Sequence, residues 1–281
     1  MSYVDFILNL AALLLWINWR SLPFDPFTKR TPATLVGTLR RAAPSRFRRW
    51  HLLAAIGALL LVRALFYWQI GSAVSWVGQL DLGVISPQFN SKWPDYILLF
   101  SVLSFALTLG TFYLSLLLLS ILNNPKAADP SPVHRLIKTQ LGGLDDWPRW
   151  AKASAPFAVM ATLWWLFSWW FEWLGIIPPF VSPWHRIEVA LVIGLGVYPA
   201  WKFIAGGLLV LRLLNTYIYF GKHPLWDYVN ETSETLLRPI DAIPLRLGKV
   251  DFRPVVALGL VFGLASGLES GLVWLYGKLP L

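Results

Sequence analysis

Long runs of apolar residues alternate along the chain with shorter polar segments. A helix needs about 20 apolar residues to cross the roughly 30 Å hydrocarbon core of a bilayer. Six runs approach or exceed that length: residues 3–19, 50–71, 95–122, 154–176, 187–219 and 254–276. The pattern predicts an all-α integral membrane protein with six transmembrane helices. The fifth run is long and contains Pro199, so we expect a kink there.

The segments between the runs differ sharply in charge. Segments 20–49, 123–152 and 220–253 are rich in Lys and Arg, whereas the other two connections hold only Lys92 and Arg186. Cytoplasmic loops carry the excess of positive charge in membrane proteins, so we expect these three segments in the cytoplasm and both termini outside. The first run has no basic segment before it and no small-residue cleavage site after it, so we expect a retained helix rather than a signal peptide.

The composition agrees with the membrane class. Hydrophobic residues make up 56% of the chain and charged residues 14%, against roughly 25% charged residues in soluble domains. A net charge of +9 would indicate nucleic acid binding in a soluble protein. Here the basic residues gather in loops, so they indicate orientation and contact with anionic lipid, and no nucleic acid. The chain has no Cys, which excludes disulfides and thiolate metal sites.

The same arrangement recurs three times along the chain. Each unit begins with a run that ends near an Asn, and a Pro follows eight or nine residues later. The pairs are Asn18 and Pro26, Asn123 and Pro132, and Asn215 and Pro224. The copies have the same sense, which indicates a parallel repeat. We expect one transmembrane domain over residues 1–281, built as three tandem hairpins at about 1–80, 95–176 and 187–281.

Two of the basic segments contain amphipathic stretches, at 133–144 and 225–240, with charged residues opposite an apolar stripe. The stripe consists of Val133, Leu136, Ile137, Leu141 and Leu144 in the first, and of Leu225, Val229, Leu236 and Ile240, with Thr232 in register, in the second. Helices of this kind lie in the plane of the membrane interface. We expect them on the cytoplasmic side, where they either cap the helix bundle or bind a partner.

The second amphipathic stretch leads through a short polar segment into the last apolar run. Pro239 and Pro244 end the helix, and Gly248 allows a tight turn. Asp251 stands where the N-cap of the next helix is expected, and Pro254 falls in its first turn, where a missing N–H costs little. We expect a hinge of fixed shape between the surface helix and the last span.

This segment resembles the motif of the YggT family of small bacterial and plastid membrane proteins. That motif runs Pro-Ile/Leu-Arg, then Pro, then Gly-Ile/Leu-Asp-Phe/Leu-Ser-Pro before an apolar run. The matching residues are Pro239, Pro244, Gly248, Asp251, Phe252 and Pro254. The chain has Asp241 where the family usually has Arg, and Arg253 where it has Ser. The resemblance implies an assembly or organising factor with no established catalytic residue, in which a third unit elaborates the family's usual two.

The sequence holds none of the common signatures of hydrolases, nucleotide-binding enzymes or zinc peptidases. Its four His residues fall at the ends of the apolar runs or between them, whereas a membrane haem needs two His facing each other within spans. We therefore predict no catalytic residue, no cofactor and no metal site.

Two apolar runs carry faces suited to helix packing. The sixth run has a glycine at every fourth position, and the third has a stripe of hydroxyl residues. The glycines are Gly259, Gly263, Gly267 and Gly271, and the hydroxyl residues are Ser101, Ser104, Thr108, Thr111 and Ser115. Small residues let helices approach closely, and hydroxyls form hydrogen bonds between them. The alternatives are packing within the chain, an interface with another subunit, and a water-lined path.

Among the charged residues inside apolar runs, four are expected at membrane depth: Arg63, Glu172, Lys202 and Glu269. An unpaired charge at the bilayer centre costs several kcal/mol. We therefore expect Arg63 to pair with Glu172 or Glu269. The alternative is that the Arg63 side chain extends to the membrane interface.

The end of the fourth run contains five Trp residues within ten positions. They are Trp164, Trp165, Trp169, Trp170 and Trp173. So large an aromatic surface at the outer leaflet indicates contact with lipid or with another subunit.

These patterns predict a non-enzymatic accessory or assembly protein of the bacterial inner membrane. Its expected partners are membrane lipids, other membrane subunits or a second copy of the chain. The alternative is a channel or transporter for a small ion or solute, lined by the third and sixth runs. A membrane enzyme that acts on lipid would need carboxylates and His converging near the interface, and the sequence shows no such convergence.

Overall fold

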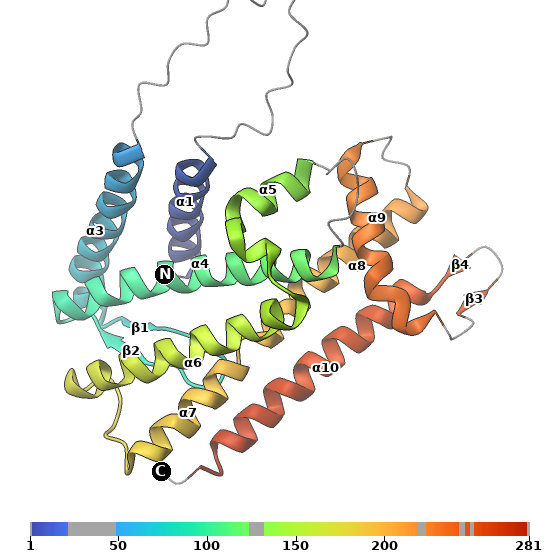
Figure 1. The fold of residues 1–281 in the computed structure, drawn as a ribbon. Coiled ribbons are helices and arrows are strands. Elements are labelled where there is room, and N and C mark those ends of the chain that lie inside the picture. The colour runs from blue at the N-terminus through green and yellow to red at the C-terminus, as the bar shows by residue number, and fades with distance from the viewer. Residues whose placement is uncertain are drawn as a thin grey trace, which may run out of the picture. The chain divides into compact units, whose positions relative to one another are not determined.

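The computed structural model describes residues 2–21, 49–123, 132–218, 223–241, 245–247 and 250–279. These residues are mostly helical (Figure 1). Four of their helices are long and apolar enough to cross a membrane. They cover Trp50–Val74, Pro94–Leu122, Pro183–Thr216 and Arg253–Tyr276. The fold is therefore of the all-α class, and its composition is that of a membrane protein.

The first and fourth expected spans are also helices, α1 (Ser2–Ser21) and α6 (Arg149–Trp173). Neither belongs to the four helices that meet the requirements of length and apolarity. The reason lies in their residues, because α1 carries Asp5 and Asn9, and α6 is rich in Trp, which is amphipathic. The expected number of six spans is therefore not confirmed.

The other helices and strands follow in chain order, with η marking a 3-10 helix. They are α3 (Arg49–Val74), β1 (Val77–Gln79), β2 (Gln88–Asn90), α4 (Pro94–Leu122), α5 (Pro132–Leu141), η1 (Gly142–Asp146), α7 (Pro183–Leu195), η2 (Tyr198–Ala200), α8 (Trp201–Tyr217), α9 (Pro224–Leu237), η3 (Arg238–Ile240), β3 (Arg246–Leu247), β4 (Val250–Asp251) and α10 (Arg253–Tyr276). The strands pair as β1 with β2 and β3 with β4.

The chain divides into two compact units. Unit 1 consists of Met1–Gly78, Phe89–Gly110 and His134–Gly142, and unit 2 consists of Gln79–Gln88, Thr111–Val133 and Gly143–Leu281. Each unit has its own core and is described separately.

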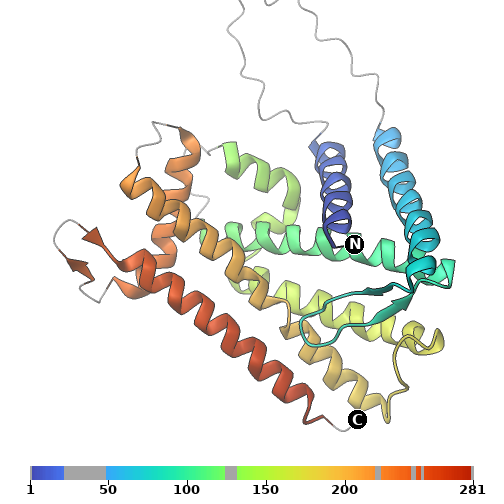
Figure 2. The ribbon, with the colours of Figure 1, turned by 180° about the vertical axis from the view of Figure 1, so that it is seen from behind.

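In unit 1, α1 and α3 lie side by side, and the first half of α4 runs steeply across them (Figures 1 and 2). Ala12, Ile56 and Phe105 form the buried core where the three helices meet. The first half of α4 crosses the α1–α3 pair and does not run alongside it (Figures 1 and 2), so the expected arrangement in three hairpins is not confirmed.

In unit 2, α7 packs along α6, and α10 packs along α8. Ile193 of α7 is completely buried. Leu209, Leu237 and Ala257 form a buried cluster that joins α8, α9 and α10. The surface helix α9 is thus part of the same core as the last two apolar helices.

The fifth expected span is a broken helix. α7 ends at Leu195, η2 contains Pro199, and α8 begins at Trp201. Proline has no N–H to donate, and its ring collides with the preceding turn of an α-helix. The kink expected from Pro199 is therefore confirmed.

Both expected amphipathic stretches are helical, as α5 and as α9 with η3. Ile137 of α5 and Val229 and Thr232 of α9 are buried, as their spacing predicted. Leu144 and Leu225 are exposed, which the spacing did not predict. Both residues lie at the ends of these stretches, beyond the part of the apolar stripe that packs against the core.

Replacing Gly194 of α7 by Ala is expected to destabilise unit 2. A Cβ at this position would lie 3.0 Å from the backbone oxygen of Phe157 and 3.0 Å from the Cβ of Ala161, both in α6. Overpacking of this kind costs about 1–3 kcal/mol. The melting temperature of the Gly194→Ala variant in detergent should therefore fall.

Gly207→Ala on α8 is the matched control, because nothing lies within 4 Å of the added Cβ. Ala is more favourable than Gly inside a helix by up to about 1 kcal/mol. The control should melt at the same temperature as the unaltered protein or higher. An equal fall in both variants would contradict the close packing of α7 against α6.

Candidate functional site

A cluster of polar side chains lies between α1, α3 and α4 in unit 1. Arg63 is 1% exposed, and its Nη2 lies 2.6 Å from Oδ1 of Asp5 in an ion pair. Its Nη1 donates a hydrogen bond of 2.5 Å to Oδ1 of Asn9. Asn9 Nδ2 donates to Ser104 Oγ at 3.0 Å, and the Tyr67 hydroxyl donates to Asp5 Oδ1 at 3.3 Å. We call these five residues the Asp5 cluster.

The Asp5 cluster corrects the partner expected for Arg63. The prediction of Glu172 or Glu269 was wrong, because α1 packs beside α3 and supplies a carboxylate within the same unit. Taking an ion out of water costs several kcal/mol, which the ion pair and its hydrogen bonds offset. Asp5 and Asn9 are four residues apart on one face of an apolar helix, and that spacing was the signal in the sequence.

Glu172 has a different partner in unit 2. It lies near the end of α6 and forms an ion pair with Arg186 near the start of α7. The Arg186 guanidinium also lies over the ring of Trp169, 3.7 Å from its centroid. A cation over an exposed Trp ring contributes about 0.5–1 kcal/mol. These contacts fix the short connection between α6 and α7.

Glu269 of α10 pairs with Lys202 of α8, with 2.6 Å between Oε1 and Nζ. The Lys202 side chain is 14% exposed, but the Glu269 side chain is 42% exposed. All four charges predicted inside apolar runs are therefore paired. Of the two carboxylates, Glu269 leaves more of its side chain accessible from outside unit 2.

The hydroxyl stripe of α4 is engaged within the protein. Ser101 donates to the Leu60 carbonyl oxygen of α3 at 2.9 Å, and Ser104 belongs to the Asp5 cluster. Thr108 and Ser115 each donate to the carbonyl oxygen four residues earlier on α4, at 3.0 Å and 2.7 Å. Of the three alternatives for this stripe, packing within the chain fits these four hydroxyls.

The Trp residues of 164–173 differ in exposure. Trp164 is 3% exposed and packs against Phe171 with 5.9 Å between ring centroids, so its expected contact with lipid or a subunit is wrong. The helix turns this position toward the interior of unit 2. The other four Trp residues are between 41% and 79% exposed, which leaves them accessible to lipid or another subunit.

Each amphipathic helix is bonded to the end of an apolar helix from earlier in the chain. In unit 1, Arg20 at the end of α1 donates to the Gln140 carbonyl oxygen of α5 at 2.9 Å. In unit 2, Asn123 at the end of α4 donates to the Tyr228 hydroxyl at 2.6 Å and accepts from Thr232 at 2.9 Å. Burial raises the pKa of the Tyr228 phenol to about 12, so the hydroxyl stays protonated. In both cases the apolar helix comes before the amphipathic helix in the chain. These two contacts do not test the threefold repeat, which stays a prediction.

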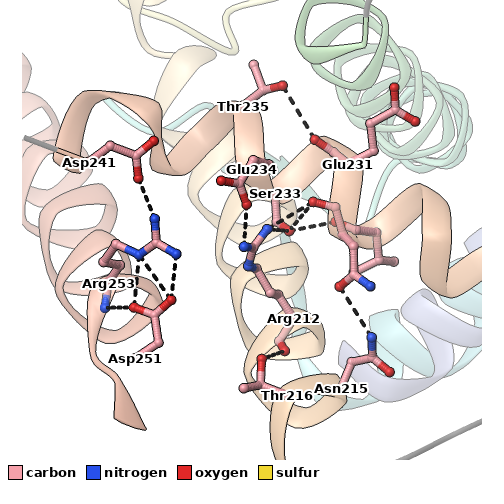
Figure 3. A network of polar contacts seen from close by, with 12 residues as sticks. Arg212, Asn215, Thr216, Glu231, Ser233, Glu234, Thr235, Asp241, Asp251 and Arg253 are labelled. Carbon is pink, nitrogen blue, oxygen red and sulfur yellow. Dashed lines mark hydrogen bonds and ion pairs between the residues drawn. The ribbon is translucent and has the colours of Figure 1, made fainter. Parts of the chain in front are cut away.

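Arg212 and Asn215 bond α8 to α9 (Figure 3). Arg212 forms an ion pair with Glu234 and donates to Ser233 Oγ at 3.2 Å. Asn215 donates to Asn230 at 3.3 Å. The surface helix is therefore held by directional polar contacts as well as by its buried apolar stripe.

Arg253, the first residue of α10, binds two carboxylates (Figure 3). Its Nη1 lies 2.6 Å from Asp241 Oδ1, and its Nη2 lies 2.7 Å from Asp251 Oδ2. Asp251 also accepts the backbone N–H of Arg253 at 3.0 Å, as a capping residue does, although the N-cap position is Phe252. Pro254 lies in the first turn, as expected. We call Asp241, Asp251 and Arg253 the Arg253 cluster.

The Arg253 cluster bears on the resemblance to the YggT motif. The two positions that depart from the motif, Asp241 and Arg253, are bonded to each other. The acidic residue at 241 and the basic residue at 253 therefore form one ion pair in this chain. Pro239 lies in η3 beside the cluster, whereas Pro244 and Gly248 lie outside the described residues.

One arrangement in unit 2 contains the residue types of a hydrolase. Lys152 Nζ donates to Ser120 Oγ at 2.8 Å, and Ser120 donates to Asp145 Oδ1 at 2.5 Å. A serine nucleophile needs a base that accepts its proton and an open approach for the substrate. All three residues here are at most 5% exposed, which leaves a substrate no open approach in this structure. In the part of the chain that the structure describes, no three His, Asp or Glu side chains form a metal-binding group.

The glycine face of α10 points away from unit 2. It consists of the four predicted glycines, Gly259, Gly263, Gly267 and Gly271. All four are exposed, and no described residue of unit 2 lies within 4 Å of a Cβ added at any of them. α10 packs on α8 through its other side, where Phe262 and Leu258 approach Gly206. Within unit 2, the predicted packing face is therefore left unused.

Comparison with known proteins finds no matching family model, curated protein or solved structure. The described residues therefore establish only the class of the protein, which is a mostly helical membrane protein.

Asp5→Ala is expected to destabilise unit 1, because it leaves the buried Arg63 guanidinium without its carboxylate. Removing one partner of a buried ion pair costs about 3–5 kcal/mol. Replacing both partners, with Asp5→Leu and Arg63→Met, should recover most of that loss, since apolar residues of similar volume need no partner. Thermal unfolding in detergent measures both effects.

The control is a double-mutant cycle that combines Arg63→Met with Glu269→Ala. These two changes should add to within about 0.5 kcal/mol, as independent sites do. A larger coupling of Arg63 to Glu269 than to Asp5 would show that the assigned pair is wrong.

Arg253→Ser is expected to destabilise the start of α10, because Asp241 and Asp251 lose their shared cation. The Asp241 side chain is 40% exposed, so we expect a loss of about 1–2 kcal/mol. Adding Asp241→Arg to this variant places a cation opposite Asp251 again and should recover at least half of the fall in melting temperature. Asp227→Arg, on the exposed side of α9, should recover nothing. Equal recovery by the two changes would refute the assigned contact of residues 241, 251 and 253.

Proposed function

We propose that this chain is a non-enzymatic accessory protein of the bacterial inner membrane that binds other membrane subunits through α10. The observation that carries the proposal is the glycine face, which is exposed along α10 from Gly259 to Gly271. Helices in a bilayer associate through small residues at every fourth position, because these let two backbones approach closely.

Hydrogen-bonding groups border the glycine face. Ser266 and Ser270 each follow a glycine of the face by three residues and are exposed. The Glu269 carboxylate is also part-exposed. Polar groups within a span bond to polar groups of neighbouring helices, and lipid tails offer none. This favours a protein helix as the partner of α10.

The proposal includes a topology of six spans in three hairpins, with both termini outside and the basic segments in the cytoplasm. α1 and α6 are the two additional spans. Their charges support this, because Asp5 is paired with Arg63 and Glu172 with Arg186, which lowers the cost of placing them in lipid. The packing of α1 with α3 and of α8 with α10 supports the first and third hairpins.

Membership of the YggT family is also part of the proposal. It rests on the motif residues of 239–254 and on the bond between Asp241 and Arg253, which accounts for both departures from the motif. An assembly role would agree with an exposed packing face on the helix that follows the motif.

Gly263→Leu combined with Gly267→Leu is expected to release the partner subunit. Tagged protein purified from native membranes in mild detergent should carry another membrane protein in fixed proportion. The double variant should retain about tenfold less of it, because the two leucines keep the partner helix from close approach. Quantitative mass spectrometry of the purified complexes measures the ratio.

Gly207→Leu on α8 is the matched control, since it makes the same change at an exposed helix position with nothing within 4 Å. It should copurify as much partner as the unaltered chain. The accessory role fails if no partner copurifies with the unaltered chain, or if the double variant and the control retain it equally. Ion or solute flux through the purified chain in proteoliposomes would favour the channel alternative instead.

A further inference from the structure

Unit 1 contains an apolar groove of about 230 Å³ between α3 and the start of α4. Leu61 and Leu65 of α3 and Leu98 of α4 line it, and all three are exposed. Its volume lies below the roughly 300–1,000 Å³ of pockets that enclose whole small molecules. The groove is therefore too small for a whole ligand and holds at most a segment of an apolar chain.

The groove is mostly apolar, and Asp95 is the one charged residue among those that line it. Leu61 lies about 10 Å along α3 from Trp68, which lines the groove together with Asp95 of α4. Asp95 is exposed, and no described residue of unit 1 bonds to its carboxylate. It also stands in the first turn of α4, near the positive end of the helix dipole. Lys92, three residues before Asp95, is exposed as well.

We propose that this groove binds a membrane phospholipid whose zwitterionic headgroup carries an ammonium group. One acyl chain lies along Leu61, Leu65 and Leu98, and the ammonium group lies against Asp95. Both helices that form the groove have the length and apolarity of membrane spans, so lipid is the solvent at its mouth. Trp68 suits the level of the headgroup, where one end of the indole is apolar and the other hydrated.

The charges select the headgroup. Asp95 attracts an ammonium group and repels a headgroup of net negative charge, and Lys92 provides a cation for the phosphate. The whole chain has a net charge of +9 and attracts anionic lipid in general. One carboxylate and one ammonium group together complement a zwitterion better than a headgroup of net negative charge, and the inference does not depend on the α10 partner.

The test is native mass spectrometry of the purified full chain, titrated separately with phosphatidylethanolamine and phosphatidylglycerol that carry identical acyl chains. Phosphatidylethanolamine should bind more tightly. Asp95→Asn should weaken its binding about two- to fivefold, as expected for an exposed ion pair, and should not weaken phosphatidylglycerol binding. Leu65→Trp, which fills the groove, should weaken the binding of both lipids.

Two variants serve as controls, Asp227→Asn on α9 and Leu264→Trp on α10, because both positions are exposed and lie outside the groove. Neither should change the binding of either lipid. Asp95→Asn alters one exposed side chain, so a folded variant is available even if Leu65→Trp does not fold. Equal affinity of the unaltered chain for the two lipids would overturn the proposal. The proposal would also be overturned if Asp95→Asn and Asp227→Asn bound phosphatidylethanolamine equally well. Either result would mean that the groove holds annular lipid only.

Discussion

Pairing of charges inside apolar helices is the constraint on which the rest of the structure depends. The three helix pairs that pack most closely are α1 with α3, α6 with α7, and α8 with α10. Each pair is joined by one ion pair, and these are Asp5–Arg63, Glu172–Arg186 and Glu269–Lys202. Lipid tails are as apolar as leucine, so apolar side chains alone do not determine which helices pair in a bilayer. An unpaired charge in lipid is costly, and it therefore determines both the neighbour and the register of its helix.

The positions of the helices could be predicted from the sequence because each apolar run is long and ends in polar residues. The partners of the charged residues could not be predicted, because all the runs are similarly apolar. Their sequences do not indicate which helices are neighbours. Arg63 shows the difficulty, since two carboxylates in other runs were equally plausible. The information was in α1, where Asp5 and Asn9 share one face of the helix. The number of spans could not be predicted for a related reason. Polar residues lower the mean hydropathy of α1, and Trp residues lower that of α6.

The glycine face of α10, which carries the proposed function, was predicted in part. The four-residue spacing of the glycines is a property of the sequence, and it indicated a packing face on α10 without any structure. The spacing could not tell whether that face is used within the chain. The structure answers this for unit 2, because Phe262 and Leu258 on another side of α10 pack on α8 at Gly206. The hydroxyl stripe of α4 looked similar in the sequence, but Ser101 and Ser104 bond within unit 1.

The break between α7 and α8 restricts how α10 can move. A broken helix leaves carbonyl and N–H groups without their usual partners, and lipid cannot satisfy them, so such a break has to be covered by protein. α10 packs against η2, and Pro199 within it is buried. If α10 moved away from unit 2, it would uncover the break at η2. The inner side of α10 is thus fixed as a cover over the gap, and a partner that binds its outer side meets a rigid support.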